Sequence, residues 1–177
     1  MRDDDFEIVR LDADDVEADL QSLVDLLADA VDDGASVGFL GPLDRATAEA
    51  YWRRRADEVG RGSRLLLAAR DGTRVVGSVQ LAFAEQQNGS HRAEVQRLVV
   101  HCGARRRGVG RALMLRLERD AREAGRTLLT LNTRAGDPPE ALYRQLGYTL
   151  VGTIPEYAQN PDGTFNTTSI MYRLLAP

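Results

Sequence analysis

The fold is decided by residues 97–115, which read RLVVHCGARRRGVGRALML. This stretch predicts a buried strand, a short basic turn with two glycines, and then an amphipathic helix. Gly108 and Gly110 let the backbone approach a ligand closely, because neither carries a Cβ atom. The first turn of a helix presents unpaired N–H groups and a partial positive charge, which favour anions. The pattern predicts a phosphate or pyrophosphate site, together with the arginines Arg105, Arg106, Arg107 and Arg111.

The composition indicates a single globular domain spanning residues 1–177. Its 43% hydrophobic and 28% charged residues are ordinary for a soluble protein. No apolar run is long enough to span a bilayer, and residues 1–5 lack the apolar region of a secretory signal. We therefore expect a cytoplasmic protein that does not bind membranes. Base rates alone favour a two-fold homodimer.

The net charge and the numbers of cysteine and histidine residues limit the kinds of ligand that this protein is expected to bind. The formal net charge of −4 argues against nucleic acid, because phosphate-backbone binding requires a broad basic surface. Basic residues gather locally at 105–107, which predicts a small anionic ligand; the alternative is a solvated arginine-rich turn. Cys102 is the single cysteine, and His91 and His101 are the only histidines. We therefore expect no disulfide and no metal site.

Periodicity and turn residues predict a mixed α/β sheet with helices on both faces. The nearly continuous apolar run at Leu98–Val100 is typical of a central strand that is buried on both faces. Asp71-Gly72 is a candidate hairpin turn. The expected strands span residues 6–11, 64–70, 75–84, 94–100, 127–132, 148–153 and 166–174. The expected helices run from Asp14 to Val31, from the cap Asp44 to about Val59, from Val109 to Gly125 and from Asp137 to Gly147. A long polar loop or broad hairpin is expected at 155–165, with its turn at Asp162-Gly163.

Residues 105–110 differ from two common phosphate loops and match a third. A Walker-type loop requires Gly-Lys-Ser/Thr where this chain has Gly108-Val109-Gly110. A dinucleotide fingerprint requires a third glycine or alanine at the position of Leu113. Arg105–Gly110 matches in full the pattern Arg/Gln-x-x-Gly-x-Gly/Ala between a central strand and a helix.

This pattern resembles the coenzyme A loop of the GNAT N-acetyltransferase superfamily, and the resemblance covers almost the whole chain. The order of expected elements is similar to the GNAT order, and Ala141–Tyr148 (ALYRQLGY) resembles the family's second motif. The resemblance implies a mixed, mostly antiparallel central sheet flanked by helices on both faces. A narrower resemblance is to small-molecule acetyltransferases related to tabtoxin resistance proteins. It rests on Gly34–Phe39, Tyr51-Trp52, Glu140–Tyr143, Ile154–Ala158 and Asp162-Gly163.

Membership of this superfamily implies acetyl-CoA as the donor, a primary amine as the acceptor and direct attack on the thioester. The pyrophosphate is expected against the backbone N–H groups of Arg106–Arg111. The pantetheine arm is expected to pair with the central strand where that strand splays from its neighbour. The implied coenzyme-binding residues are Leu98, Val99, Val100, Arg105, Arg106, Arg107, Gly108, Val109, Gly110, Arg111 and Asn132.

Two residues are candidates for the proton transfers of this reaction. The resemblance implies Tyr143 as the general acid for the leaving thiolate, since a phenol can donate a proton; the alternative is a packing tyrosine. Glu94 is implied as the general base; the alternative is a strand-edge carboxylate paired with Arg92 or Arg97.

The sequence offers further candidates for contacts with the coenzyme and the acceptor. Asn132 is a candidate contact for the pantetheine or the acceptor, because Gly136 and Asp137 stand where the family often has an asparagine. Cys102 is expected to be a bystander, since neighbouring His101 should point away on an extended segment. The acceptor pocket has three aromatic candidates, for which core packing is the alternative: Phe39, Trp52 and Tyr157.

The leading hypothesis is an acetyl-CoA-dependent N-acetyltransferase that acts on a small-molecule amine, such as an antibiotic or a toxin. The acidic net charge favours a cationic acceptor through steering. Acetylation of a protein N-terminus or lysine is an alternative, but it needs an open groove, which the loop at 155–165 is expected to narrow. A non-catalytic acyl-CoA-binding module is the other alternative. It would retain Arg105–Gly110 and dispense with Glu94 and Tyr143.

Overall fold

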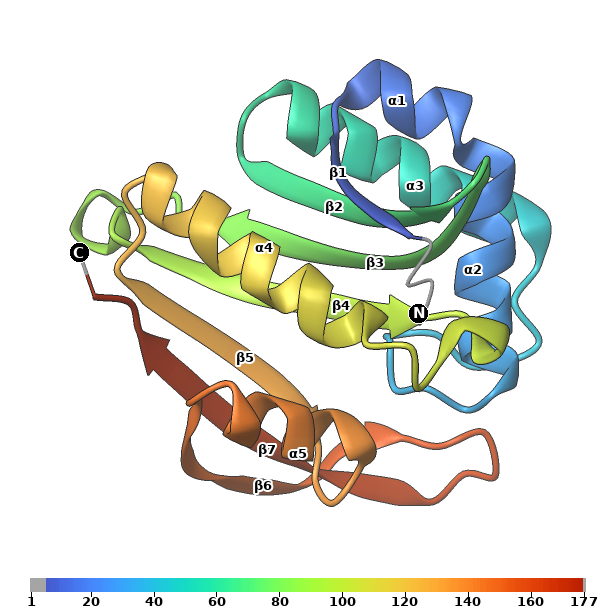
Figure 1. Cartoon of the computed structure of the whole chain (residues 1–177). Helices are drawn as coiled ribbons and strands as arrows, with labels where there is room; N and C mark the ends of the chain where they lie inside the picture. The colour runs from blue at the N-terminus through green and yellow to red at the C-terminus, as the bar shows by residue number, and fades with distance from the viewer. Residues whose placement is uncertain (1–5, 177) are drawn as a thin grey trace.

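The computed structural model describes residues 6–176, so the acidic segment 1–5 and its expected lack of a secretory signal lie outside the described residues. Seven strands form one sheet in the order β1-β2-β3-β4-β5-β7-β6 (Figure 1). All neighbours are antiparallel except β4 and β5, which run parallel. The expected mixed, mostly antiparallel sheet is confirmed. The strands are β1 (Glu7–Leu11), β2 (Arg64–Asp71), β3 (Arg74–Phe83), β4 (Arg92–Val100), β5 (Leu128–Arg134), β6 (Thr149–Gln159) and β7 (Phe165–Leu174).

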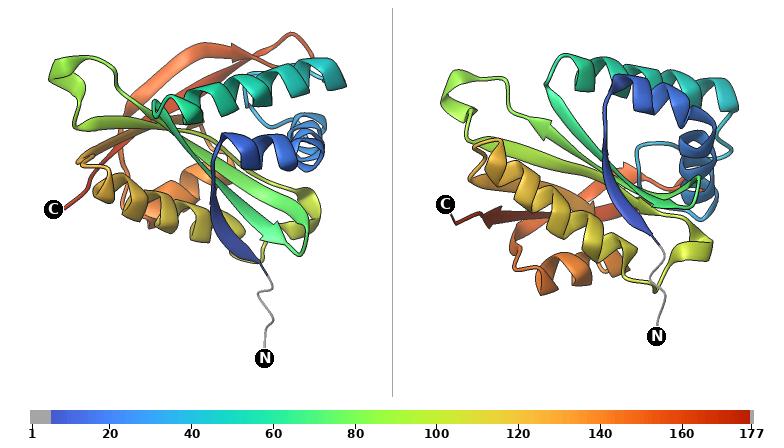
Figure 2. Two further views of the ribbon diagram at one scale, coloured as in Figure 1. Left: turned by 90° about the horizontal axis from the view of Figure 1, so that it is seen from above. Right: turned by 45° about the horizontal axis from the view of Figure 1, so that its top comes forward.

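Helices cover both faces of the sheet, as the sequence predicts. Figures 1 and 2 show α4 and α5 together on one side and α1, α2 and α3 on the other. Leu113 and Leu117 of α4 belong to one buried cluster, and Leu23 and Leu27 of α2 belong to a second. Among residues 6–176, no helix is both long and apolar enough to cross a bilayer. The helices are α1 (Ala13–Ala18), α2 (Leu20–Asp32), α3 (Arg45–Gly60), α4 (Val109–Glu123) and α5 (Pro138–Gln145).

The first helical region is divided in two, so the prediction of one helix from Asp14 to Val31 is wrong. Asp19 ends α1 and precedes α2. Its carboxylate accepts a hydrogen bond from the Arg70 guanidinium of β2 at 2.6 Å. Aspartate is a weak helix former, and this partner lies 51 residues away. Local periodicity therefore does not reveal the break.

The segment expected to be a loop or broad hairpin at 155–165 forms the hairpin that joins β6 to β7, so the second alternative is confirmed, although β6 runs beyond its expected end at residue 153. β6 continues to Gln159, and Pro155 is tolerated because β6 is an edge strand. Its pairing with β7 is interrupted by an irregularity between Ile154 and Ala158. The predicted turn at Asp162-Gly163 is confirmed, since it lies within the short connection from β6 to β7.

The central strand β4 parts from its parallel neighbour β5 soon after the two meet. Their register pairs Arg92 with Leu128 and Glu94 with Thr130, and it ends there. On its other edge, β4 stays paired with β3 as far as Val100. The predicted central position of this strand is confirmed. Within residues 6–176, its backbone nevertheless has no strand partner on the β5 side beyond Glu94.

A β-bulge changes the direction of side chains where the two strands part. Opposite Val79 of β3, the strand β4 places two residues, Arg97 and Leu98, and Arg97 has a left-handed φ of 48°. Strict alternation would put Gln96 and Arg97 on opposite faces of the sheet. The bulge lets both face the side of α3, where the Arg97 guanidinium lies over the ring of Tyr51.

The contact between β3 and α4 predicts a destabilising substitution at Gly77. An alanine Cβ there would lie 2.9 Å from Val109 Cγ1 and 3.2 Å from the Val99 carbonyl oxygen. We expect Gly77→Ala to lower the free energy of unfolding by about 1–3 kcal/mol, because the packed core must shift. Urea denaturation measures the change. Gly152→Ala is the control, since nothing lies within 4 Å of its added Cβ; equal losses in the two variants would contradict the prediction.

Candidate active site

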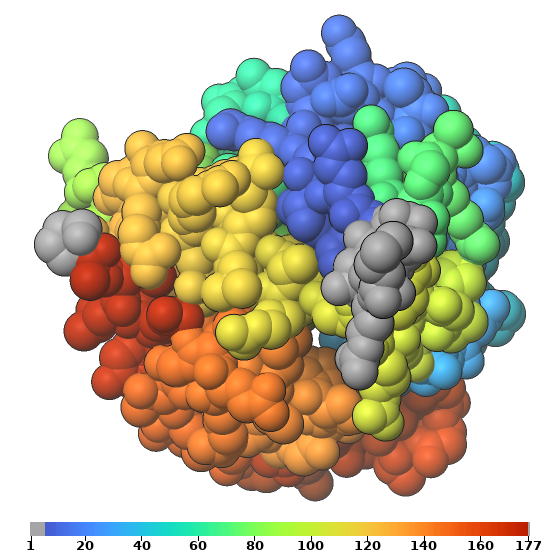
Figure 3. All heavy atoms as spheres, in the orientation of Figure 1, coloured from blue at the N-terminus to red at the C-terminus, as the bar shows by residue number. Residues whose placement is uncertain are grey.

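The turn between β4 and α4 presents a row of unpaired backbone N–H groups. From Arg106 to Arg111, no N–H donates to an acceptor in the described part of the chain, and the next one, of Ala112, donates to the Gly108 carbonyl at 3.0 Å. Arg106 and Gly108 have left-handed φ values of 63° and 83°. In Figure 3 the turn lies on the surface beside the start of α4. Such a row of amides at a helix start can bind an oxyanion.

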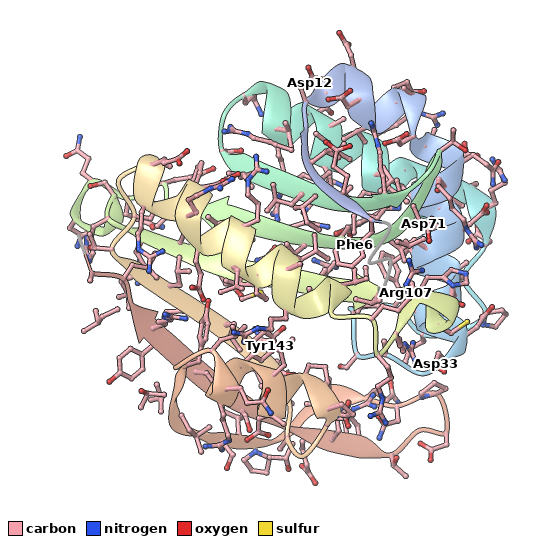
Figure 4. The ribbon with its side chains drawn as sticks, in the orientation of Figure 1. Phe6, Asp12, Asp33, Asp71, Arg107 and Tyr143 are labelled. Carbon is pink, nitrogen blue, oxygen red and sulfur yellow. The ribbon has the colours of Figure 1, made fainter. Side chains whose placement is uncertain are left out.

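Ion pairs hold two arginines of this turn. Arg105 Nη1 lies 2.7 Å from Asp33 Oδ2, and Arg107 Nη1 lies 2.8 Å from Asp71 Oδ2. Figure 4 labels Arg107 near both aspartates. The four arginines therefore do not act alike: two brace the turn against the end of α2 and the β2–β3 hairpin. Among the described residues, the backbone amides from Arg106 to Arg111 have no hydrogen-bond acceptor and so are available to an anion.

The open edge of β4 leads directly into this turn. Leu98 and Val100 pack their side chains against the cluster that contains α4, whereas buried Val99 packs on the opposite side. Their backbone groups on the β5 side lack a strand partner. An extended ligand with an anionic end could therefore pair with this edge and place its anion on the amides.

Two adjoining hollows lie on the other side of the opening between β4 and β5. The first, of about 250 Å³, lies among residues 36–38, 94–97, 132–134, 157–158 and Thr168. The second, of about 230 Å³, lies between residues 34–40 and the β6–β7 hairpin. They share the lining residues Ser36, Gly38, Arg134 and Ala158. Together they form a cleft of the size that takes a small molecule.

Glu94 lies on the wall of the first hollow and is held by amides. Its Oε2 accepts a hydrogen bond from Gln96 Nε2 at 3.0 Å, and its Oε1 is 3.4 Å from Asn132 Nδ2. Gln96 in turn accepts from Arg64 Nη1 at 3.0 Å. Within residues 6–176, no arginine nitrogen lies within 4.0 Å of this carboxylate. The alternative pairing with Arg92 or Arg97 is therefore not observed, and Glu94 faces the hollow as an available acceptor.

Tyr143 approaches the opening from the opposite face. It is 5% exposed and belongs to the α4-side cluster, where its ring lies 5.7 Å from that of Tyr148. Figure 4 shows it between α4 and α5. Burial raises the pKa of the Tyr143 phenol well above its usual value of 10.0. The phenol therefore stays protonated and remains a donor at any physiological pH.

The remaining predicted residues are divided between cleft and core. Asn132 and the half-exposed Tyr157 line the first hollow, and Phe39 lines the second. Trp52 is 1% exposed and lines neither hollow, because it is packed within the α1–α3 cluster. Trp52 is therefore a core residue, which was the alternative to its place in the acceptor pocket.

The surroundings of Cys102 differ from the expectation. Cys102 begins a tight turn, so His101 does not point away: its Nδ1 lies 3.8 Å from the thiol sulfur. The donor atoms of Asp29, His101 and Cys102 lie within 4.8 Å of one another. However, the Gly103 N–H donates to His101 Nδ1 at 3.1 Å, and Arg74 Nη2 lies 2.7 Å from Nε2. A hydrogen bond to Asp29 raises the pKa of the Cys102 thiol, which disfavours both the nucleophile and the metal ligand.

The polar residues of the cleft that the sequence analysis did not predict include Gln96, Arg97 and Arg134. Gln96 stands two residues after Glu94 and Arg134 two residues after Asn132. Strand alternation places each on the same face as its predicted neighbour. No local signal places Arg97 there, because the bulge that turns it depends on pairing with β3.

The chain belongs to the acetyltransferase (GNAT) family, whose model matches residues 29–148. Two curated proteins of Azospirillum brasilense are similar to it. An uncharacterized N-acetyltransferase in the hisH-hisA intergenic region is 31% identical over 118 residues, 66% of this chain and 68% of the relative. An IAA acetyltransferase is 37% identical over 103 residues, 58% and 65% of the two chains.

Solved structures confirm the fold. A GNAT superfamily phosphinothricin acetyltransferase from Sinorhizobium meliloti, in complex with AcCoA, has a TM-score of 0.81 at 22% identity, with 97% of this chain and 89% of that chain covered. The putative acetyltransferase yncA from Salmonella typhimurium, with its cofactor acetyl-CoA, has a TM-score of 0.77 at 19% identity, with 97% and 95% covered.

Proposed function

We propose that this protein transfers an acetyl group from acetyl-CoA to the primary amine of a small molecule. The observation that carries the proposal is the row of six free N–H groups from Arg106 to Arg111, continuous with the unpaired edge of β4. A pyrophosphate suits the first feature and an amide-containing arm suits the second. The two related structures named above with the acetyl coenzyme support this choice of donor.

The shape of the acceptor side favours a small molecule over a protein. The cleft is bounded by residues 34–40 on one side and the β6–β7 hairpin on the other, and its two parts measure about 230 and 250 Å³. A polypeptide acceptor would need an open groove across this region. The strand extension of β6 brings ordered backbone to the place where such a groove would run.

The proposed reaction is direct attack of the amine on the thioester. Glu94 takes a proton from the amine, directly or through a water, while the nitrogen bonds to the acetyl carbon. The carbon–sulfur bond then breaks, and the departing sulfur receives a hydrogen bond from Tyr143. A thiol has a pKa of about 8.5, far below that of buried Tyr143. The hydrogen bond from Tyr143 therefore stabilises the departing thiolate, and water supplies the proton of the thiol once the sulfur has left.

Thiol release from acetyl-CoA with a panel of primary amines tests the function. We expect release that depends on both acetyl-CoA and at least one small amine, and N-acetylated product by mass spectrometry. Lysine-containing peptides in the same panel test the protein-acetyltransferase alternative. Acetyl-CoA binding without turnover on any amine would instead support a non-catalytic module.

Gly108 should matter for coenzyme affinity more than for folding. Gly108→Ala puts a methyl group beside the free amides and strains a left-handed backbone, so we expect the KM for acetyl-CoA to rise about tenfold, or 1.4 kcal/mol. Gly125→Ala is the matched control at the other end of α4, because its φ is 73° and nothing lies within 4 Å of an added Cβ in either case. A similar rise in KM for both variants would show that Gly108 acts through helix stability alone.

Tyr143→Phe should lower kcat by on the order of a hundredfold and leave the affinity for acetyl-CoA nearly unchanged. The reason is that the ring remains packed while the donor to the sulfur is lost. Steady-state kinetics and coenzyme titration measure the two effects. Tyr148→Phe makes the same change at a neighbouring buried ring and should keep wild-type turnover. Unchanged kcat in Tyr143→Phe would remove this phenol from the mechanism.

Glu94→Gln should abolish the acidic limb of the pH profile of kcat/KM and lower its plateau by on the order of a hundredfold. An amide keeps the shape of the side chain and cannot accept the proton. Glu123→Gln, on an exposed side chain of α4, is the control. A variant profile that retains the wild-type acidic limb would exclude Glu94 as the base.

A further inference from the structure

The Arg97 guanidinium lies on the acceptor cleft without an anionic partner. It lines the first hollow together with Glu94. Its Nε donates to the Val37 carbonyl oxygen at 2.9 Å, and within residues 6–176 no carboxylate oxygen lies within 4.0 Å of its nitrogens. Its two terminal nitrogens form no hydrogen bond with the described residues. They are therefore available to a molecule in the cleft.

Several features fix this guanidinium in place before any ligand arrives. The bulge turns Arg97 toward the cleft at a φ of 48°, a conformation that costs a non-glycine residue about 1–2 kcal/mol. The ring of Tyr51 lies beneath the guanidinium at 5.0 Å. Gly38 leaves room for it, since a Cβ there would lie 2.9 Å from Arg97 Nη2. A cation that is already immobilised loses little side-chain entropy when it binds an anion.

Arg134 adds a second positive charge from the β5 side of the same cleft. It lines both hollows. Its contacts are long, at 3.4 Å to Asp137 Oδ2 and 3.3 Å to Asn160 Oδ1, and its buried Nε has no hydrogen-bond partner. The charged residues on the two walls are thus two arginines and one glutamate. The Arg134 guanidinium shares its charge with Asp137, whose Oδ2 lies 3.4 Å from Nη1, whereas Arg97 has no carboxylate oxygen within 4.0 Å among residues 6–176.

From this arrangement we infer that the acceptor is an amine that also carries a carboxylate, as an amino acid does. The carboxylate binds the terminal nitrogens of Arg97, Arg134 balances the remaining charge, and the amine is directed toward Glu94. A planar guanidinium can bind a carboxylate through two parallel hydrogen bonds. The inference rests on the proposed function, because it names the substrate class of the same site.

Matched acceptors test the inference. Each amino acid in a panel is paired with its carboxamide, which keeps the amine and removes the negative charge. We expect wild-type kcat/KM to favour the acid about tenfold to a hundredfold, since hydrogen bonds between charged groups are lost in the amide. Arg97→Gln should remove this preference by raising the KM for the acid, with kcat and the KM for acetyl-CoA nearly unchanged. Arg92→Gln, on the exposed start of β4, should behave as the wild type.

A binding experiment keeps the inference testable even where turnover is slow. Coenzyme A is joined through an S-acetyl bridge to the nitrogen of glycine, β-alanine or 4-aminobutyrate, and to the corresponding carboxamides. At least one acid conjugate should bind the wild type about tenfold more tightly than its amide, and Arg97→Gln should abolish the difference. Equal binding of acid and amide in all three pairs, or an unchanged difference in Arg97→Gln, would overturn the inference. If coenzyme A itself fails to bind and no amine releases thiol, the proposed function fails instead.

Discussion

Past Glu94 and Thr130, the backbones of β4 and β5 stop exchanging hydrogen bonds in the middle of a seven-stranded sheet. Buried backbone groups that lack partners are costly, and each of the two strands is paired along its other edge. β3 holds β4 as far as Val100, and β7 holds β5 from Leu128 to Arg134. The sheet is therefore two well-paired halves that share a short parallel contact. The amide-lined turn, the free strand edge and the cleft all lie around the place where the halves separate.

Sequence reasoning succeeded where the determinants are local. The turn at Arg105–Gly110 combines glycines with a helix start, so its conformation and its free amides follow from a few adjacent residues. The order of the elements and the central place of β4 follow from periodicity. Glu94 and Asn132 were found by resemblance, and the structure brings them to 3.4 Å of each other.

The features that sequence reasoning missed depend on distant partners. At the break between α1 and α2, the Asp19 carboxylate accepts a hydrogen bond from Arg70, which lies 51 residues away in the sequence. Pro155 is compatible with β6 because β6 is an edge strand. The orientation of Arg97 depends on the register with β3, because one extra residue reverses the face of every side chain that follows it. Trp52 was predicted as a candidate for the acceptor pocket but lies in the core. The sequence alone does not distinguish a helical aromatic residue that lines a pocket from one that packs in the core.

Tyr143 and Glu94 lie on opposite faces of the sheet, which has a consequence for the order in which the two substrates bind. Tyr143 belongs to the α4 side of the sheet, and Glu94 to the cleft on the α3 side. Under the proposed function, the donor and the acceptor bind from opposite faces of the sheet and meet at the opening between β4 and β5. Neither molecule has to leave before the other arrives. Both substrates can be bound at once in a ternary complex, and the reaction needs no covalent acetyl-enzyme intermediate.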